Sequence, residues 1–155
     1  MKSRRGVQGL AVALLVTACG GEAAKDADSA QKVVPAPARA GQVTVSIDSP
    51  ANGATIDAAD VRVTLSVTGI EIAPVAEGRA GTAHHHLFLD RDLTPFDAVI
   101  PLDDPRVVHM GDGRSEHTFE GLAPGPHRVI AVLADPHHIP LDPPVADTVE
   151  FTVGG

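Results

Sequence analysis

The sequence predicts an all-β protein, an antiparallel β-sandwich of about seven strands. Short segments in which apolar and polar residues alternate recur through the chain, as expected for half-buried strands. Turns rich in glycine, proline, asparagine and aspartate separate them, and the 15 glycines and 13 prolines are enough to supply every such turn. No segment after the first residues repeats apolar side chains at helical spacing. Many short strands without helices are typical of a sandwich.

The first two predicted strands show the clearest alternation. Residues 43–47 place valine and isoleucine between threonine and serine, and residues 61–67 repeat the pattern. Between them, Ser49-Pro50-Ala51-Asn52-Gly53 predicts a turn, because an Asn-Gly pair adopts positive φ readily. This turn followed by an alternating strand resembles the opening of many bacterial immunoglobulin-like domains. The Cys–Trp–Cys core of antibody domains is missing, so only an immunoglobulin-like sandwich is predicted.

Five further strands are expected along the rest of the chain, at residues 84–90, 107–110, 115–120, 127–135 and 148–153. The fourth of these follows a Pro-Gly-Pro turn and contains the nearly all-apolar run Val-Ile-Ala-Val-Leu-Ala. A strand with apolar residues on both faces is expected to lie centrally, covered from both sides.

The N-terminal residues predict a lipoprotein signal peptide over residues 1–18. A positive start is followed by an apolar run at 10–16, which is too short to span a bilayer. Val16-Thr17-Ala18-Cys19 resembles the bacterial lipobox, in which the chain is cut before a cysteine that carries the lipid. Cys19 is the single cysteine and excludes an intrachain disulfide. The alternative is an ordinary secretory signal with an incidental cysteine.

Residues 19–41 are rich in alanine, proline and glycine and predict a flexible tether, which leaves residues 42–155 for the sandwich. The acidic balance, 20 acidic against 12 basic residues, argues against nucleic acid and against anionic lipid headgroups as partners. The N-terminal lipid is then the expected membrane link. The chain is expected in the cell envelope, facing the periplasm or the exterior. Gly20 after the cysteine favours the outer membrane where the host has one.

Three consecutive histidines, His84, His85 and His86, open one predicted strand. Side chains alternate between the two faces of a strand, so His84 and His86 are expected on one face and His85 on the other. Two imidazoles spaced in this way form a chelating pair for zinc or copper. The alternative is a β-bulge, which would exchange the two faces.

Two later segments carry the other candidate ligands. His109 lies in Val108-His109-Met110-Gly111, and His138 and Asp135 lie in Asp135-Pro136-His137-His138. We expect a site for zinc or copper(II) formed by His84, His86, His109 and His138 at one end of the sandwich, with Asp135 as a ligand or as a group that orients one. Copper(I) is disfavoured, because it prefers soft sulfur ligands.

The remaining histidines are expected to have no part in this site. His85 and His127 share their faces with core residues and are predicted to be structural, and His117 is predicted to be incidental. Asp142 and Glu116 are loop carboxylates that each give a weak signal. No nucleophile elbow, phosphate loop, dinucleotide fingerprint or zinc-protease helix is present, so no enzymatic activity is predicted.

Four motifs together resemble an uncharacterised bacterial family, domain-of-unknown-function family 4399. The family pattern contains Gly-Thr-Gly-His-His-His-Leu, then His-Phe-Gly-Gly-Gly-Gln-Thr-Glu, Pro-Gly-x-His and Asp-x-x-His-x-Pro, in that order. The chain matches over residues 47–153, with Ala83 and Met110 replacing a glycine and a phenylalanine and a changed turn at 112–115. The resemblance supports the organisation and implies no activity.

The sequence therefore favours an envelope lipoprotein that binds a divalent metal ion through a histidine cluster. The alternative is a metal-free interaction or structural module of the envelope, in which histidines bridge loops by hydrogen bonds.

Overall fold

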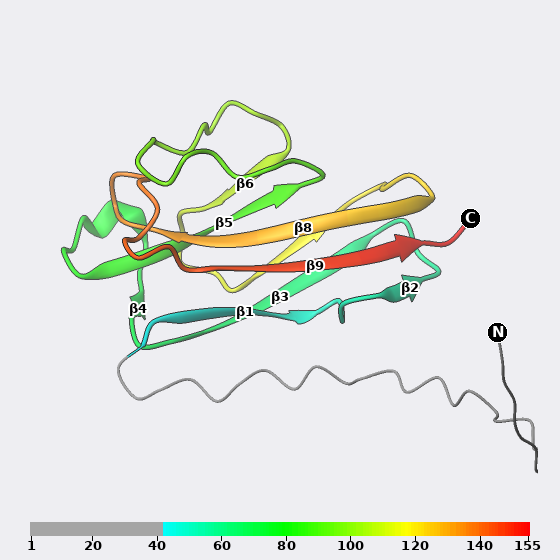
Figure 1. The fold of residues 1–155 in the computed structure, drawn as a ribbon, viewed down its shortest axis with the longest axis horizontal. Coiled ribbons are helices and arrows are strands. Elements are labelled where there is room, and N and C mark those ends of the chain that lie inside the picture. Colours follow the sequence, from blue (N-terminus) through cyan, green and yellow to red (C-terminus); the bar gives the residue numbers. More distant parts are fainter. Residues whose placement is uncertain (1–41) are drawn as a thin grey trace, which may run out of the picture. The chain divides into compact units, whose positions relative to one another are not determined.

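The computed structural model describes residues 42–155 and shows an all-β domain (Figure 1). The strands are β1 (Thr44–Ser49), β2 (Ala54–Ile56), β3 (Val61–Thr68), β4 (Glu71–Ile72), β5 (Thr82–Leu89), β6 (Val107–Met110), β7 (Glu116–Phe119), β8 (Gly125–Ala134) and β9 (Ala146–Val153), with a single 3₁₀ turn, η1 (Val75–Glu77). Across these described residues, no helix has the length and apolar character needed to cross a membrane. The predicted signal peptide, Cys19 and the tether lie outside this range.

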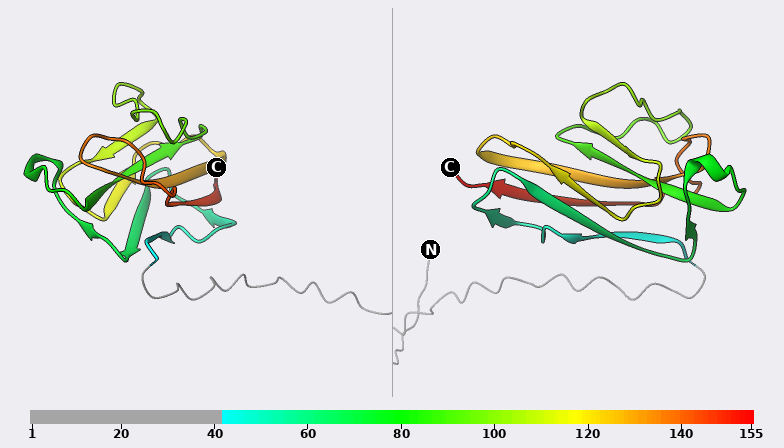
Figure 2. Two further views of the ribbon diagram at one scale, coloured as in Figure 1. Left: turned by 60° about the vertical axis from the view of Figure 1, so that its left-hand side comes forward. Right: turned by 180° about the vertical axis from the view of Figure 1, so that it is seen from behind.

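Two sheets pack face to face and confirm the sandwich (Figures 1 and 2). The smaller sheet has the order β1-β3-β7, and the larger has the order β2-β9-β8-β5-β4, with β6 also paired to β5. The main core lies between them, and includes Val63, Leu65, Leu87, Val129 and Phe151. This is the sheet-on-sheet architecture that alternating sequences favour.

The seven predicted strands are all present, but the count of seven is too low. β2 and β4 have three and two residues, too few to show a periodic pattern in the sequence. Both are also parallel to their partners, β2 to β9 and β4 to β5, so the sandwich is not wholly antiparallel. These short strands extend the two ends of the larger sheet, where they cover parts of its edges.

The Asn52-Gly53 turn forms as predicted. Gly53 has φ +78°, and its N–H donates to the Glu150 carbonyl. The Asn52 side chain accepts a hydrogen bond from the Glu150 N–H. The turn therefore joins β2 to β9 as well as reversing the chain.

The prediction that the apolar strand is central is also confirmed. β8 lies between β5 and β9, and its residues 129–134 are all buried. One face contributes to the main core, while Ile130 and Val132 belong to a second apolar cluster with Phe88, Ile100 and Val107. This second cluster lies on the outer face of the larger sheet, under the long loop 90–106. The outer face of β5 is consequently buried rather than solvated.

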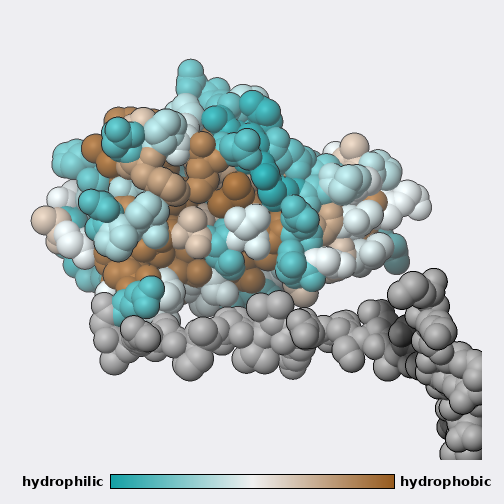
Figure 3. Space-filling view, viewed as in Figure 1, coloured by the Kyte–Doolittle hydropathy of each residue, from teal (hydrophilic) through white to brown (hydrophobic). Residues whose placement is uncertain are grey.

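The loop that covers the outer face leaves apolar side chains exposed. Of the four large apolar side chains exposed in residues 42–155, Phe96, Val99 and Leu102 belong to this loop and Ile139 to the turn after β8. Figure 3 shows apolar surface toward the end of the molecule where β4 lies, surrounded by hydrophilic side chains. The loop that covers the outer face of the larger sheet therefore leaves part of its own apolar surface exposed to solvent.

Candidate metal centre

Strand β5 presents two histidines on the outer face of the larger sheet. In the β5–β8 pairing, His84 lies opposite Ala134 and His86 opposite Val132. The register is continuous from His84 to Leu89, so no bulge exchanges the faces and the alternation predicted from sequence holds. Both side chains are almost completely buried, with 1% and 0% of their surface exposed.

His109 reaches the same face from the neighbouring strand. β6 pairs with the other edge of β5 and places His109 directly opposite His86. Directly opposite residues in antiparallel strands point to the same side of the sheet, so the two rings lie next to each other. Their centroids are 5.2 Å apart.

His138 comes from the turn that follows β8. Its backbone is left-handed, with φ +64°, which is unfavourable for a residue other than glycine. The Asp135 carboxylate holds this turn by accepting hydrogen bonds from the N–H groups of His137 (2.8 Å) and Ile139 (3.0 Å). The His138 carbonyl accepts a bond from the N–H of Ile100 in the covering loop. Backbone strain retained in this way is common at functional sites.

The four rings converge on one point. Each of His84, His86, His109 and His138 offers a ring nitrogen, and these atoms lie within 4.8 Å of one another. The Nε2 atoms of His109 and His138 are 3.2 Å apart. The rings lie on the outer face of the larger sheet, near the end where β5 begins and β8 ends, because β5, β6 and the turn after β8 meet there.

Several buried nitrogens in this cluster have no hydrogen-bond partner. His86 leaves both ring nitrogens unpaired and His84 leaves Nε2 unpaired. An unpaired buried polar atom costs about 1–3 kcal/mol, so three of them in one small space are unfavourable without a ligand. A metal ion would bind one nitrogen of each ring and so remove the penalty at that atom. The donor set therefore fits a transition metal that binds imidazole.

The surroundings keep the buried rings neutral. Burial, followed by the proximity of His109 and His138, lowers the pKa of His84 to about 4 despite an opposing effect of Asp135. Burial, followed by the proximity of His84, lowers the pKa of His86 to about 2. Burial also lowers the pKa of His109. Neutral imidazole is the form that binds a metal, so these rings are ready to coordinate near neutral pH.

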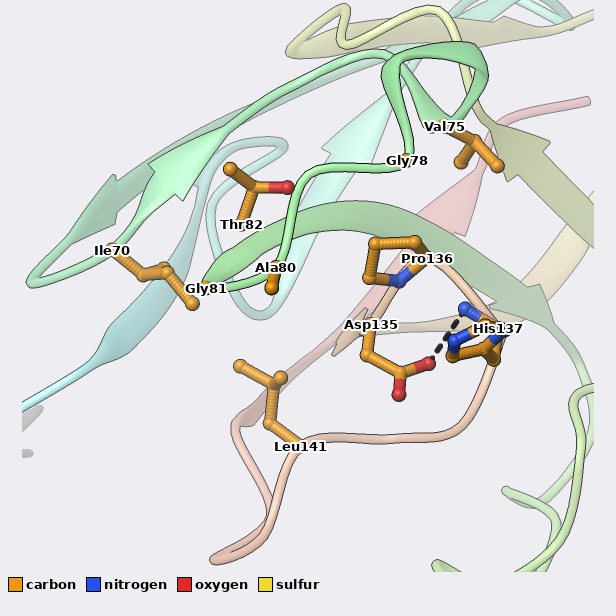
Figure 4. Close-up of a pocket in the computed structure, with 10 residues that line it drawn as sticks. All are labelled: Ile70, Val75, Gly78, Ala80, Gly81, Thr82, Asp135, Pro136, His137 and Leu141. Carbon is orange, nitrogen blue, oxygen red and sulfur yellow. Dashed lines mark hydrogen bonds between the residues drawn. The ribbon is translucent and has the colours of Figure 1, made fainter.

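Asp135 does not join the four histidines, so of its two expected roles, ligand or group that orients a ligand, the second fits the structure. Its carboxylate is outside the set of converging atoms and instead accepts the two backbone hydrogen bonds of the turn. It lies on the wall of a separate cavity of about 390 Å³, together with Thr82, His137 and Leu141 (Figure 4). Its role toward the cluster is positional, because the turn it holds carries His138.

His85 and His127 are engaged by the protein itself, as expected of structural residues. The Nδ1 atom of His85 lies 3.1 Å from the Arg114 carbonyl. The ring of His127 lies 2.7 Å from the Asp90 carboxylate and 2.8 Å from the Ala123 carbonyl. His117 packs against Phe119, away from the cluster. Among residues 42–155, His127 has partners at both ring nitrogens and His85 at Nδ1 alone, with its Nε2 buried and unpaired, whereas His86 has no partner at either nitrogen.

His127 predicts a pH-dependent stability. Burial lowers its pKa, but the hydrogen bonds to Ala123 and Asp90 outweigh burial and the net pKa is raised. Since both ring nitrogens face oxygen acceptors, the protonated ring alone satisfies both. The stability that the protonated His127 ring contributes to the fold is fully present below the pKa of histidine in the unfolded chain, about 6.5. It is lost as the pH rises through the higher pKa of His127 in the folded chain.

Urea unfolding should therefore show a loss of about 1 kcal/mol, the scale of one hydrogen bond, between pH 6 and pH 9. His127→Gln has no titrating side chain at position 127 and should lack this loss of stability. Asp90→Asn removes one acceptor of the ring and should make the loss smaller. An equal pH dependence in the wild-type chain and His127→Gln would contradict the assignment.

Gly111 is a site residue that sequence reasoning did not single out. A Cβ at this position would overlap Cε1 and Nε2 of the His109 ring. The sequence could have indicated this residue, because the family pattern also has a glycine two residues after the histidine that corresponds to His109. The ring keeps its position only if residue 111 has no side chain.

Gly111→Ala is therefore expected to weaken metal binding by about 10- to 100-fold, the range found when groups that position a ligand are lost. The half-exposed His109 ring can swing outward, so the metal-free fold should tolerate the change. Isothermal titration with zinc measures the effect, and His117→Ala is the control. Unchanged affinity in Gly111→Ala would show that His109 does not bind the ion.

Comparisons with known proteins identify a family and no activity. The family model described as "Domain of unknown function (DUF4399)" matches residues 63–154. No curated protein matches the chain by sequence. A crystal structure of an engineered protein aligns with a TM-score of 0.43 and 16% identity over 74% of this chain, and the chain spans 20% of that protein's length. The family match includes all four converging histidines.

Proposed function

The chain belongs to the DUF4399 family, and from the geometry of its histidines we propose that it binds a divalent transition-metal ion, zinc or copper(II). The observation that carries this proposal is the convergence of four imidazoles whose buried nitrogens lack protein partners. His84 and His86 are more than nine-tenths buried, yet their unpaired nitrogens face the same small space. Both metals take imidazole nitrogen as a ligand.

The alternative function, a metal-free module with histidines as internal struts, fits other residues. A strut is a ring whose nitrogens bond to backbone or side-chain oxygens, and His85 and His127 have such bonds. Within residues 42–155, the hydrogen bond found for the four cluster rings joins two of them, His109 and His138. One of the two nitrogens must donate there, so the bond satisfies the pair in the neutral form without anchoring it to the fold.

Metal analysis of the purified chain tests the proposal directly. The full chain, without a polyhistidine tag, should retain about one zinc or copper ion per molecule after extraction from its native membranes. The double variant His84→Ala/His86→Ala should retain none. His137→Ala is the matched control, because His137 neighbours His138 in the same turn but is not among the converging rings. Metal-free wild-type protein, or equal metal in the double variant, would refute the proposal.

The role that follows is metal handling, sensing or metal-stabilised structure in the cell envelope. The lipoprotein signal predicted over residues 1–18, directly before Cys19, supports this location, since the lipid would hold the domain at a membrane through the predicted tether at residues 19–41. Cys19→Ser should move the chain from the membrane fraction to the soluble fraction and abolish labelling by radioactive palmitate. Continued labelling of Cys19→Ser would exclude this cysteine as the acceptor.

A further inference from the structure

The arrangement of the four rings distinguishes between coordination geometries. The six distances between ring centroids range only from 4.6 to 5.6 Å. Four points at nearly equal mutual distances form a tetrahedron. Four points in a square have two diagonals that are longer than the edges by about 1.4-fold, as in the tetragonal sites that copper(II) prefers.

A square arrangement does not describe this cluster. If the longest distance, His86–His138 at 5.6 Å, is taken as one diagonal, the other must be His84–His109, which is 5.1 Å. The four remaining edges are 4.6, 5.0, 5.2 and 4.8 Å. A square with edges of about 4.9 Å would need diagonals of about 6.9 Å. Both observed distances are far shorter.

The size of the tetrahedron fits one zinc ion. Zinc–nitrogen bonds are about 2.0–2.1 Å, and the centre of an imidazole lies about 1.1 Å beyond its nitrogen, so centroids around a tetrahedral zinc lie about 5.2 Å apart. The observed range of 4.6–5.6 Å contains this value. The separation of 3.2 Å between the Nε2 atoms of His109 and His138 is close to the about 3.3 Å edge of a tetrahedral zinc site. The four ligand atoms together spread over up to 4.8 Å, so the wider pairs would have to close in on the ion.

The rest of the site argues against a copper(I) centre and against a catalytic zinc. Met110 is the nearest candidate for a soft ligand in β6, but it packs in the main core on the other face of the sheet.

Four protein ligands complete a tetrahedral shell, whereas catalytic zinc keeps one position for water or substrate. The carboxylate of Asp135, which acts electrostatically on His84, would offset part of the double positive charge, whereas that of Asp112 is paired with Arg114 at 3.1 Å.

We infer that the four histidines form a closed, tetrahedral zinc centre without a position for an exogenous ligand. This inference rests on the proposed metal binding and narrows it to one metal and one geometry. It assigns the site to metal storage, delivery or structure, and not to metal-assisted hydrolysis.

Cobalt(II) substitution tests the geometry, because its visible spectrum reports coordination. The metal-free full chain titrated with cobalt(II) should develop the intense bands of tetrahedral cobalt, and one equivalent of zinc should abolish them. Added azide should leave the spectrum unchanged. In His138→Gly, which keeps the left-handed backbone but opens one position, azide should shift the bands. His137→Ala should behave as wild type.

The outcomes separate the inference from the proposal that it extends. A weak, six-coordinate cobalt spectrum, or a shift by azide in the wild-type chain, would overturn the closed tetrahedral centre while leaving metal binding in place. A tetragonal copper(II) signal in electron paramagnetic resonance, with four nitrogen ligands, would also overturn it. Failure of zinc, cobalt and copper to bind at all would refute metal binding itself, and with it the inference.

Discussion

Zinc is expected to raise the melting temperature of the metal-free chain by on the order of 15 °C. A ligand that binds only the folded state stabilises it by about 4 kcal/mol when its free concentration is a thousand times Kd. For a domain of this size each kcal/mol corresponds to about 4 °C or more. The expected gain is large because the ion would also bind one unpaired nitrogen of His84 and one of His86. Differential scanning calorimetry on untagged, chelator-treated protein measures it.

Two variants identify the site responsible for this gain. The double variant His84→Ala/His86→Ala should show no rise in melting temperature on addition of zinc, whereas His137→Ala should show the full rise. A gain that persists in the double variant would place the bound zinc elsewhere on this acidic chain. Magnesium at the same concentration should have no effect, since it prefers oxygen ligands.

His86→Leu is expected to change stability in opposite directions with and without metal. His86 is fully buried, and both of its ring nitrogens lack hydrogen bonds in the metal-free site. Replacing a buried, unpaired polar side chain with an apolar one removes a penalty of about 1–3 kcal/mol. The metal-free variant should therefore unfold at a higher urea concentration than the wild-type chain, while zinc should no longer stabilise it to the wild-type level.

This result would separate the metal-binding function from the strut function. A strut loses its hydrogen bonds when it becomes leucine, so the metal-free protein would become less stable. His127→Leu provides the comparison, because both ring nitrogens of His127 bond to oxygen atoms of Asp90 and Ala123. We expect His127→Leu to destabilise the fold and His86→Leu to stabilise it. Destabilisation by both changes would assign His86 to the fold and not to a ligand.

The metal-free cluster combines several features that lower the stability of the folded state. Histidines that leave nitrogens unpaired reduce stability in the metal-free state, and the left-handed backbone of His138 adds strain. Features that lower stability without a metal are typical of residues retained for function. They are concentrated on the outer face of the larger sheet, whereas the main core between the sheets is apolar apart from His85.

The sequence alone determined the local structure of this protein, namely its longer strands, its turns and the direction of side chains along each strand. Alternation in residues 43–47 and 61–67, the Asn52-Gly53 turn and the apolar run in β8 predicted the strands, because side-chain direction along a strand is set by the pleat of a single chain segment. For the same reason, His84 and His86 could be placed on one face and His85 on the other. The strands β2 and β4 were missed because two or three residues carry no period.

Only the tertiary structure decided which histidines meet and in what geometry. His109 and His138 are separated by 29 residues, and their contact depends on the pairing of β6 with β5 and on the turn after β8. The outer face is buried because the loop 90–106 covers its apolar residues, which no local pattern indicates. Asp135, a candidate ligand by proximity in sequence, instead holds the turn. Strand register and loop packing are long-range properties, so they arise from the whole fold and not from any one segment.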